Sequence, residues 1–524
     1  MSAARPALTS KPTLLVWIGL LGLILLLRVP TLSFPFENDS GAIAYHARYI
    51  TRSEPLYSTH HPSHHLPGAF YLYALSFQLF GDQVASVKWV LLLWIWVTVC
   101  LIYQLGAKIG NRTIGLGAAI LAAVLYSHIE LSGQSARVEM FLGLGHVAAV
   151  LLLVHTLQRQ GSRRNFFFIG IIGGLTFMFK ATALSGFGLA CIACLMAWRR
   201  QPNRPGLNLF LQRILLLGLG FLSSLLPVLL YFASLNLLPR LLMIFTLARQ
   251  YIGVARPGLE GPQYLILYPL AVLAKNNFLI LIAALSGLVF VLRPRSEKTE
   301  LIGTTNEGVS TPYFIYIAIW FGLAFIETGT SRTYLQHYYL VFVPPLTLLA
   351  AWFLYKLYVD IQPHVQRRTA VSILVIAISA IFFLSIQQNF PFYYHFIRYA
   401  IGLEDFDTFL LEGFPDAGNI VRIERDLADY LRSHTEPSDT IYYWSNFMEL
   451  YYFADRRCAI AFIWPIYAEA SGEYPQIFQA KYIVIGNNTI FGLDEIPQWL
   501  PEGLHEHYVL ETTIHEQAIY RRLE

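Results

Sequence analysis

The chain has 524 residues, of which 55% are hydrophobic and only 13% are charged. An ordinary soluble domain carries about 25% charged residues, so these figures exclude a soluble enzyme, a fibrous protein and a disulfide-stapled secreted domain. The composition is that of a polytopic membrane protein.

Apolar runs of bilayer length recur along most of the chain. A membrane-spanning helix needs about 20 predominantly apolar residues, with a tolerance of several. Runs of this kind predict eleven transmembrane helices, which lie near residues 13–33, 84–106, 113–129, 138–157, 166–180, 183–198, 214–234, 277–292, 312–328, 338–356 and 370–386.

Charge is divided unevenly between two parts of the chain. Residues 1–386 hold 28 basic and 12 acidic residues, whereas residues 387–524 hold 9 basic and 21 acidic residues. Cytoplasmic loops of membrane proteins are enriched in Lys and Arg. With a cytoplasmic N-terminus, alternate loops place 17 of the 28 bases inside. Eleven spans then leave the acidic tail outside, so we expect an extracytoplasmic C-terminal domain.

The predicted topology divides the chain into two domains. Residues 1–386 form a helical membrane domain. In its first outer loop, 34–83, apolar and aromatic residues recur at helical spacing over 41–50 and 66–80, as in helices that lie in the membrane interface. Residues 387–524 are predicted to form a small α/β domain. Its expected helices cover 420–432 and 448–457, and its expected strands cover 440–444, 481–486 and 517–521.

Two acidic residues follow the first predicted span at the outer membrane surface. Acidic side chains against a membrane are costly unless they are used, so Glu37 and Asp39 are candidate functional residues. Asp39 can accept a proton from a hydroxyl group, and either carboxylate can hold a cation. The alternative is structural, because Asn38, Asp39 or Ser40 can cap the following helix. From spacing alone, the cap is the favoured interpretation.

The same outer loop contains four histidines within six residues, His60, His61, His64 and His65. Histidines and carboxylates together can bind a transition metal. A divalent metal ion held by Glu37, His61 and His65 is therefore one hypothesis. A polar interfacial loop without metal is the alternative, and the spacing favours it.

Charged residues also lie at the ends of the middle helices. Arg137 and Glu139 stand where the fourth predicted span begins, and either they pair with each other or one of them contacts a substrate. Lys180 ends the short fifth span on the outer side, against the enrichment of bases inside. A lysine at a helix end commonly extends to the interface, and an anionic partner is equally supported here.

Bases and aromatic residues gather before the tenth predicted span. Arg332, His337 and Tyr338 lie there, and Arg256 lies in an earlier outer loop. Phosphate is the natural partner of such bases, since a guanidinium fork matches its oxygens. Lipid headgroups are the alternative partner, and for any single base they are favoured.

Four stretches of the sequence resemble the motifs of one family, the GT-C glycosyltransferases of the protein-mannosyltransferase and aminoarabinose-transferase type. Asn38–Ile50 is similar to the acidic motif and the interfacial helix that follows it. Tyr57–Gly81 is similar to the Lys-Pro-Pro motif and the apolar helix ending in Phe-Gly. Gly174–Lys180 looks like the Gly-Leu…Lys turn, and Arg332–Leu340 with Pro344–Pro345 resembles the bacterial His-Tyr…Pro-Pro motif.

The resemblance implies a GT-C fold with a membrane catalytic domain, in the plasma (inner) membrane. It implies a sugar donor linked to polyprenyl phosphate and a lipid, glycan or protein acceptor on the outer face, with no nucleic acid and no cofactor besides a divalent metal ion. Asp39 aligns with the family's general base. The residues that the resemblance places at the donor phosphate are Lys180, Arg332, His337 and Arg256. Those placed at the acceptor or its loop are Glu37, His65, Arg137, Glu139 and Tyr338.

The sequence departs from the family pattern in this loop. His65 and Leu66 stand where the family's Lys-Pro-Pro motif has its Lys and its first Pro. Where the family often has two acidic residues, this chain has Asn38 followed by Asp39. Besides a glycosyltransferase, a second and a third function are also open. A transporter or flippase of a lipid-linked glycan would carry charges along a central path, whereas the ionisable residues fall mainly at predicted helix ends. The third is a non-catalytic assembly subunit whose tail binds a partner.

Overall fold

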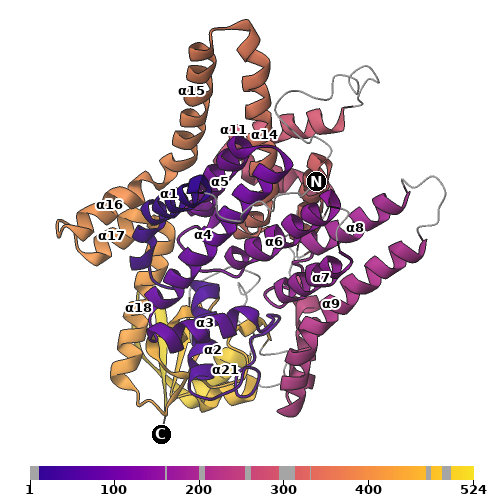
Figure 1. Ribbon diagram of the computed structural model, residues 1–524. Coiled ribbons are helices and arrows are strands. Elements are labelled where there is room, and N and C mark those ends of the chain that lie inside the picture. Colours follow the sequence, from indigo (N-terminus) through magenta and orange to yellow (C-terminus); the bar gives the residue numbers. More distant parts are fainter. Residues whose placement is uncertain are drawn as a thin grey trace.

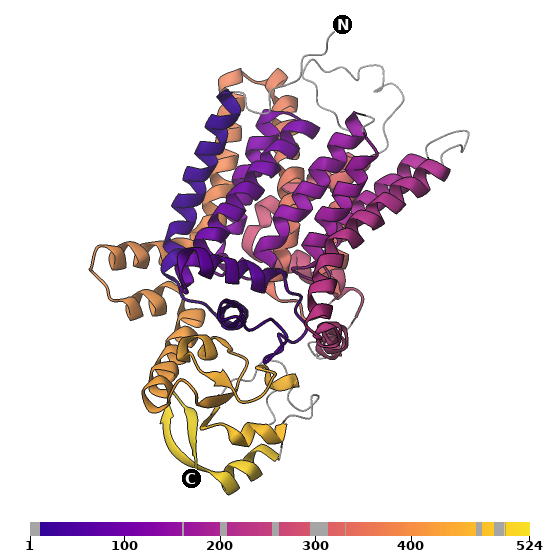
Figure 2. The ribbon, with the colours of Figure 1, turned by 60° about the horizontal axis from the view of Figure 1, so that its bottom comes forward.

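The computed structural model describes residues 11–159, 162–199, 207–253, 261–293, 313–330, 332–467, 474–486, 497 and 499–523. Most of these residues form helices that gather in a bundle. A small sheet near the C-terminal end lies beyond one end of this bundle (Figures 1 and 2).

Six described helical segments are long and apolar enough to cross a membrane, and each overlaps a predicted span. They are Thr13–Ser33, which contains most of α1 (Lys11–Arg28), Val84–Ile109 (α4), Glu139–Gln158 (α6), Leu207–Ser234 (α9), Gln336–His364, which contains α14 (Val343–Ile361), and Val371–Ala400, which contains most of α15 (Arg367–Ile386) and all of α16 (Phe390–Ala400). A multi-pass helical membrane protein is therefore confirmed.

The other five predicted spans fall on shorter apolar helices. These are α5 (Arg112–Tyr126), α7 (Arg164–Phe177), α8 (Ser185–Arg199), the second half of α11 (Tyr264–Leu292) and α13 (Phe314–Gly329). α11 is two helices joined at Asn277, whose backbone is not helical (φ −149°, ψ 47°). The predicted span 277–292 begins at this kink. The number of eleven spans stays a prediction.

Two short helices of the outer loop, α2 (Asn38–Thr51) and α3 (Gly68–Phe80), match the helices expected there. The backbone N–H of Glu37 donates to Oγ of Ser40 (2.9 Å), and this hydroxyl donates to the carbonyl of Glu37 (2.7 Å). These bonds satisfy backbone groups at the start of α2, as in a capping box. The N-cap residue is therefore Glu37, one position before the three that the sequence suggested, while Ser40 completes the capping box and Asp39 lies in the first helical turn.

The C-terminal part contains a five-stranded sheet in the order β2-β1-β3-β5-β4. β1 pairs in parallel with β2 and β3, whereas β5 pairs antiparallel with β3 and β4. Its strands are β1 (Thr440–Trp444), β2 (Arg457–Cys458), β3 (Tyr482–Ile485), β4 (Tyr508–Ile514) and β5 (Gln517–Arg522). Its helices are α18 (Pro415–His434), α19 (Glu449–Ala454) and α21 (Trp499–His507), and α17 (Phe406–Gly413) precedes them.

The prediction of a helix over residues 448–457 is wrong at its end. α19 stops at Ala454 because Asp455 adopts a left-handed conformation (φ 50°, ψ 45°), and Arg457 belongs to strand β2. A residue of this conformation ends a helix. The strands over 440–444, 481–486 and 517–521 are confirmed by β1, β3 and β5.

α2 lies between the helical bundle and the sheet. In Figure 2 it is the indigo helix that is viewed along its axis, below the bundle and above the sheet. Arg48 of α2 bonds through Nη1 to the carbonyl of Tyr452 (2.7 Å) and through Nε to Oδ2 of Asp82 (2.5 Å). A Cβ atom built on Gly41 would lie 2.4 Å from Cβ of Glu449, so the helix backbones are in close contact. The outer loop thus joins the two parts of the molecule.

Candidate active site

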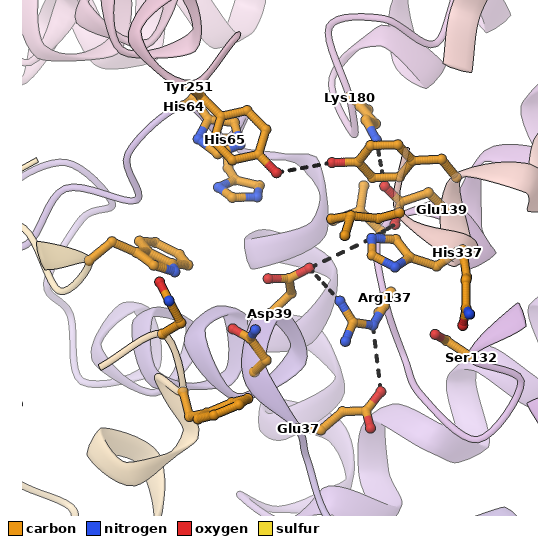
Figure 3. Close-up of a pocket in the computed structure, with 18 of the residues that line it drawn as sticks. Glu37, Asp39, His64, His65, Ser132, Arg137, Glu139, Lys180, Tyr251 and His337 are labelled. Carbon is orange, nitrogen blue, oxygen red and sulfur yellow. Dashed lines mark hydrogen bonds and ion pairs between the residues drawn. The ribbon is translucent and has the colours of Figure 1, made fainter. Parts of the chain in front are cut away.

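A cavity of about 460 Å³ lies where the outer loop, several helix ends and the C-terminal domain meet. Its wall includes Asp39 at the start of α2, Lys180 after α7, His337 before α14 and Trp464 from the C-terminal domain. Figure 3 shows the labelled side chains converging on the region around Asp39. This is the size and position of a small-ligand site between domains.

Asp39 is paired with a buried arginine. Nη1 of Arg137 donates to Oδ2 of Asp39 across 2.7 Å, and Nε of Arg137 lies 3.5 Å from Oε1 of Glu37 (Figure 3). The side chain of Asp39 is 29% exposed, whereas those of Arg137 and Glu37 are 14% and 10% exposed. Arg137 thus bridges two carboxylates and leaves the aspartate accessible from the cavity.

A second ion pair joins the end of α7 to the start of α6. Nζ of Lys180 donates to Oε1 of Glu139 (2.6 Å) and lies 3.5 Å from the ring centroid of Tyr338. Nε2 of His337 lies 3.9 Å from Oδ2 of Asp39 and 4.0 Å from Oε2 of Glu139. His337 therefore stands between the two acidic groups and connects the two ion pairs.

Charges in this cavity are already balanced against one another. Burial alone would lower the pKa of Arg137, but Asp39, Glu37 and Glu139 together raise that pKa above its ordinary value. Arg137 therefore remains a cation. An anionic ligand can bind Arg137 or Lys180 only by competing with the carboxylates that these cations already contact.

Histidine and tyrosine rings form another wall of the cavity. His64 stacks on Tyr251 with ring centroids 4.3 Å apart, and its Nδ1 lies 2.7 Å from the hydroxyl of Tyr467. His65 stacks on Trp464 with ring centroids 5.5 Å apart. Burial lowers the pKa of both histidines, and it does so despite the opposing effect of nearby carboxylates on His65. Both rings are therefore neutral near pH 7.

The C-terminal part of the chain contributes a carboxyl group that the sequence did not single out. Glu449 lines the cavity and is fully buried. Burial raises the pKa of Glu449 to about 8, with a contribution from Glu37, against the opposing effects of nearby backbone amides and of Arg137. Glu449 is therefore mostly protonated near pH 7. In the sequence it stands in an ordinary helical segment, and only the docking of α19 on α2 brings it to the cavity.

The structure brings together most of the residues predicted for the site. Those that line the cavity are Glu37, Asp39, His65, Arg137, Glu139, Lys180, His337 and Tyr338. Arg332 is exposed and is not among the described residues of the wall. A left-handed backbone at Arg332 (φ 55°) and at Tyr334 (φ 50°) turns the chain between them. Arg256 lies outside the described residues.

The predicted metal ligands do not form a set in the described part of the chain. No three His, Cys, Asp or Glu side chains there are placed to hold one metal ion. Glu37 pairs with Arg137, Nε2 of His61 lies 2.7 Å from the carbonyl of Arg240, and Nδ1 of His65 lies 3.1 Å from that of Pro62. These three residues are therefore not arranged as a metal site in the part of the chain that the structure describes.

Solved structures with the same architecture come from two kinds of glycosyltransferase. ArnT from Cupriavidus metallidurans bound to undecaprenyl phosphate matches with a TM-score of 0.60 over 98% of this chain and 99% of that one, at 12% identity. The chain has the GT-C glycosyltransferase fold. The GT-C fold that the motif resemblance implies is thereby confirmed.

More distant matches agree with this fold. The Archaeoglobus fulgidus oligosaccharyltransferase, solved in complex with Zn and sulfate, matches with a TM-score of 0.54 over 90% of this chain and 67% of that one, at 14% identity. The archaeal oligosaccharyltransferase AglB from the same organism, in complex with an inhibitory peptide and a dolichol-phosphate, matches with a TM-score of 0.51 over 91% and 69%, at 12% identity.

The sequence comparison covers a smaller part of the chain. Residues 60–209 match the family model for dolichyl-phosphate-mannose-protein mannosyltransferase. No curated protein matches the chain.

Proposed function

We propose that the chain is an integral-membrane glycosyltransferase that moves a sugar from a polyprenyl-phosphate-linked donor to an acceptor hydroxyl. The observation that carries this proposal is the position of Asp39, which lies in a cavity with Arg137, Lys180 and His337. The fold supports it, as does the polyprenyl phosphate bound by ArnT of Cupriavidus metallidurans. The exposed carboxylate and the nearby cations provide the two functions that the reaction needs.

The proposed reaction is a single displacement. The acceptor oxygen attacks the anomeric carbon of the sugar while Asp39 takes the hydroxyl proton as general base. The bond between that carbon and the phosphate oxygen breaks, and the polyprenyl phosphate leaves with the electron pair. The configuration at the anomeric carbon is therefore inverted. Phosphate is a stable leaving group, so charge stabilisation can replace a strong general acid.

The cations of the cavity are proposed to bind the donor phosphate. Lys180 supplies a mobile ammonium at the cavity wall, and its 24% exposed side chain can exchange Glu139 for a phosphate oxygen. Arg137 holds Asp39 in place. His337 lies within 4.0 Å of both carboxylates and can donate to the phosphate from its ring. Arg332 and Arg256 have no assigned role in this scheme.

The proposed orientation follows from the distribution of bases in the sequence. The N-terminus is cytoplasmic, and the cavity and the domain 387–524 lie on the outer side of the plasma (inner) membrane. Residues 1–386 then form the catalytic membrane domain. The donor lipid reaches the cavity from the bilayer, and the acceptor reaches it from the aqueous side.

The test is transfer by the purified protein in lipid nanodiscs. Polyprenyl phosphates carrying radiolabelled hexoses or pentoses are incubated with extracts of cell-envelope lipids, glycans and proteins as acceptors. We expect label to leave the donor and to appear in one acceptor fraction with inverted anomeric configuration. Failure of every donor to lose its sugar would contradict the proposal.

The alternative function is transport of a lipid-linked glycan, and the transfer assay distinguishes it from glycosyl transfer. Two ionisable side chains inside the bundle, His146 and Glu327, contact each other across 3.2 Å, and Glu327 also accepts from the backbone N–H of Ser185 (3.0 Å). These groups satisfy one another rather than forming a row along a path. Movement of the intact lipid-linked sugar across sealed vesicles, without transfer, would favour the transporter.

A further inference from the structure

Three polar atoms beside the cavity have no regular hydrogen-bond partner. Oδ1 of Asn38 and both carboxyl oxygens of Glu449 are buried and have no partner of regular hydrogen-bond geometry among the described residues, although the backbone amides of Asn38 and Glu449 lie near the carboxyl group. Both residues line the cavity that contains Asp39. Unpaired buried polar groups are costly and rare in folded proteins. A ligand that enters the cavity is the natural partner for these atoms.

The chemistry of the two side chains defines what they can bind. The amide oxygen of Asn38 is an acceptor, and a protonated Glu449 offers one O–H donor together with acceptor oxygens. A hydroxyl group both donates and accepts, so neighbouring hydroxyls of one molecule can satisfy both residues. A site that hydrogen bonds hydroxyls strongly rejects analogues that lack them.

The charges on this side of the cavity disfavour an anion. Glu37 and Asp39 flank Asn38, and Glu424 lies behind Glu449, where its Oε1 accepts from the hydroxyl of Tyr443 (2.6 Å). Burial and the neighbouring carboxyl of Glu449 raise the pKa of Glu424, so this pair of carboxyls supplies no cation to an anionic ligand. An anionic acceptor would therefore find no free cation at these residues, because Arg137 already pairs with Glu37 and Asp39.

Aromatic rings complete the binding surface. The stacked pair of His65 and Trp464 lines the same cavity, as does Tyr467. Faces of this kind pack against the apolar C–H surface of a sugar ring, and the polar groups at its edge fix its orientation.

We infer that Asn38 and Glu449 form the acceptor subsite, and that the acceptor is a neutral saccharide whose hydroxyl groups they bind. This inference rests on the proposed function, because a hydroxyl held beside Asn38 is adjacent to the base at Asp39. It assigns the C-terminal domain a role in acceptor recognition through α19.

The test is binding of three probes to the full-length protein in nanodiscs, measured by equilibrium dialysis. The probes are radiolabelled maltotriose, the anionic trigalacturonate, and octyl phosphate. We expect maltotriose to bind at least 10-fold more tightly than trigalacturonate. Glu449→Leu should weaken maltotriose binding by about 10- to 100-fold. Glu449→Gln keeps a donor and an acceptor in the same shape, so it should bind within about 3-fold of the wild type.

A second variant keeps the inference falsifiable if Glu449→Leu fails to fold. Asn38 has a left-handed backbone (φ 28°), which glycine adopts readily, so Asn38→Gly removes the amide without straining α2. It should also weaken maltotriose binding by 10-fold or more. Unchanged binding in a folded Glu449→Leu or in Asn38→Gly would overturn the inference. Equal or tighter binding of trigalacturonate, or no binding of maltotriose by the wild type, would overturn it as well.

The same measurements separate this inference from the proposed function. Asp39→Asn should still bind maltotriose, because the subsite does not depend on the base. Sugar transfer that is indifferent to Glu449→Leu would overturn the inference alone. Maltotriose binding without transfer from any lipid-linked donor would overturn the proposed function alone.

Discussion

Arg137 and Asp39 form a close ion pair in the cavity, with Nη1 and Oδ2 separated by 2.7 Å. The two residues are 98 positions apart in the chain, so the fold of the loop before α6 onto the start of α2 creates the pair. Arg137 also lies 3.5 Å from Glu37 and so neutralises two carboxylates at once. The proposed base and the residue that orients it therefore come from different segments of the chain.

Arg137→Ala should lower kcat for sugar transfer by about 10²–10³-fold, because Asp39 then loses its fixed orientation and faces Glu37 without a cation between them. Arg137→Lys keeps the positive charge but cannot contact Glu37 and Asp39 through two separate nitrogens. It should therefore recover only part of the lost kcat. Arg112→Ala, at an exposed arginine that begins α5, is the matched control and should leave transfer unchanged. Steady-state kinetics measure all three, and full activity of a folded Arg137→Ala would remove Arg137 from the site.

Lys180→Ala should raise the KM for the lipid-linked donor by about 10-fold or more, since the donor phosphate loses a cation and Glu139 is left buried without its partner. Lys180→Arg should retain most of the donor affinity, because a guanidinium also pairs with phosphate. Binding of polyprenyl phosphate to the nanodisc-embedded variants separates the donor effect from chemistry. If Lys180→Ala bound the lipid as the wild type does, the phosphate role of Lys180 would be wrong.

Gly41→Ala should loosen the contact between α2 and α19, because the added methyl would lie 2.4 Å from Cβ of Glu449 and 2.5 Å from its Cα. We expect a loss of stability of about 1–3 kcal/mol, as for an overpacked core. The melting temperature, followed by intrinsic fluorescence, measures it. Gly22→Ala in α1 is the control, since nothing lies within 4 Å of its added methyl. Equal melting temperatures for the two variants would show that the helices are not packed this closely.

Acidification should weaken the attachment of the outer loop to the C-terminal domain. Burial lowers the pKa of His60 and of His61 to about 4, from an ordinary value of 6.5. The unfolded chain thus binds more protons than the folded one between pH 6.5 and pH 4, and stability falls as the pH decreases through that window. Each histidine contributes at most about 1.4 kcal/mol per pH unit.

Melting temperatures between pH 7.5 and pH 4.5 check this dependence. In the His61→Gln variant the new side chain cannot gain a proton, so its melting temperature should fall less with decreasing pH than that of the wild type. His364→Gln, at an exposed histidine, should follow the wild type. A wild-type melting temperature that did not change below pH 6.5 would contradict the buried, neutral state of these rings.

The sequence was informative where local pattern determines structure. Apolar runs located the helices, and the ranges expected for three strands fall on β1, β3 and β5. β4 was missed because it pairs only with β5 through a turn at His515 and Glu516. Both turn residues have positive φ (47° and 66°) but neither is the Gly or Asn that usually indicates such a turn.

The site was predicted in part for the same reason. Asp39, Arg137 and Lys180 stood out as charged residues at helix ends. Glu449 carried no such signal, because its role depends on a contact with Gly41 more than 400 residues away in the chain. Arg332 looked equivalent to the other bases in the sequence, yet its side chain is exposed and only the residues after it, from Tyr334 to Tyr338, line the cavity.

The central claim is that Asp39 takes the proton of the acceptor hydroxyl. The most direct measurement compares wild type and Asp39→Asn for transfer of radiolabelled sugar from polyprenyl phosphate, with melting temperature and binding of polyprenyl phosphate measured on the same samples. We predict that Asp39→Asn stays folded, binds the lipid phosphate and transfers sugar about 10²–10⁴-fold more slowly, as expected for loss of a general base. Transfer by Asp39→Asn at the wild-type rate would contradict the claim.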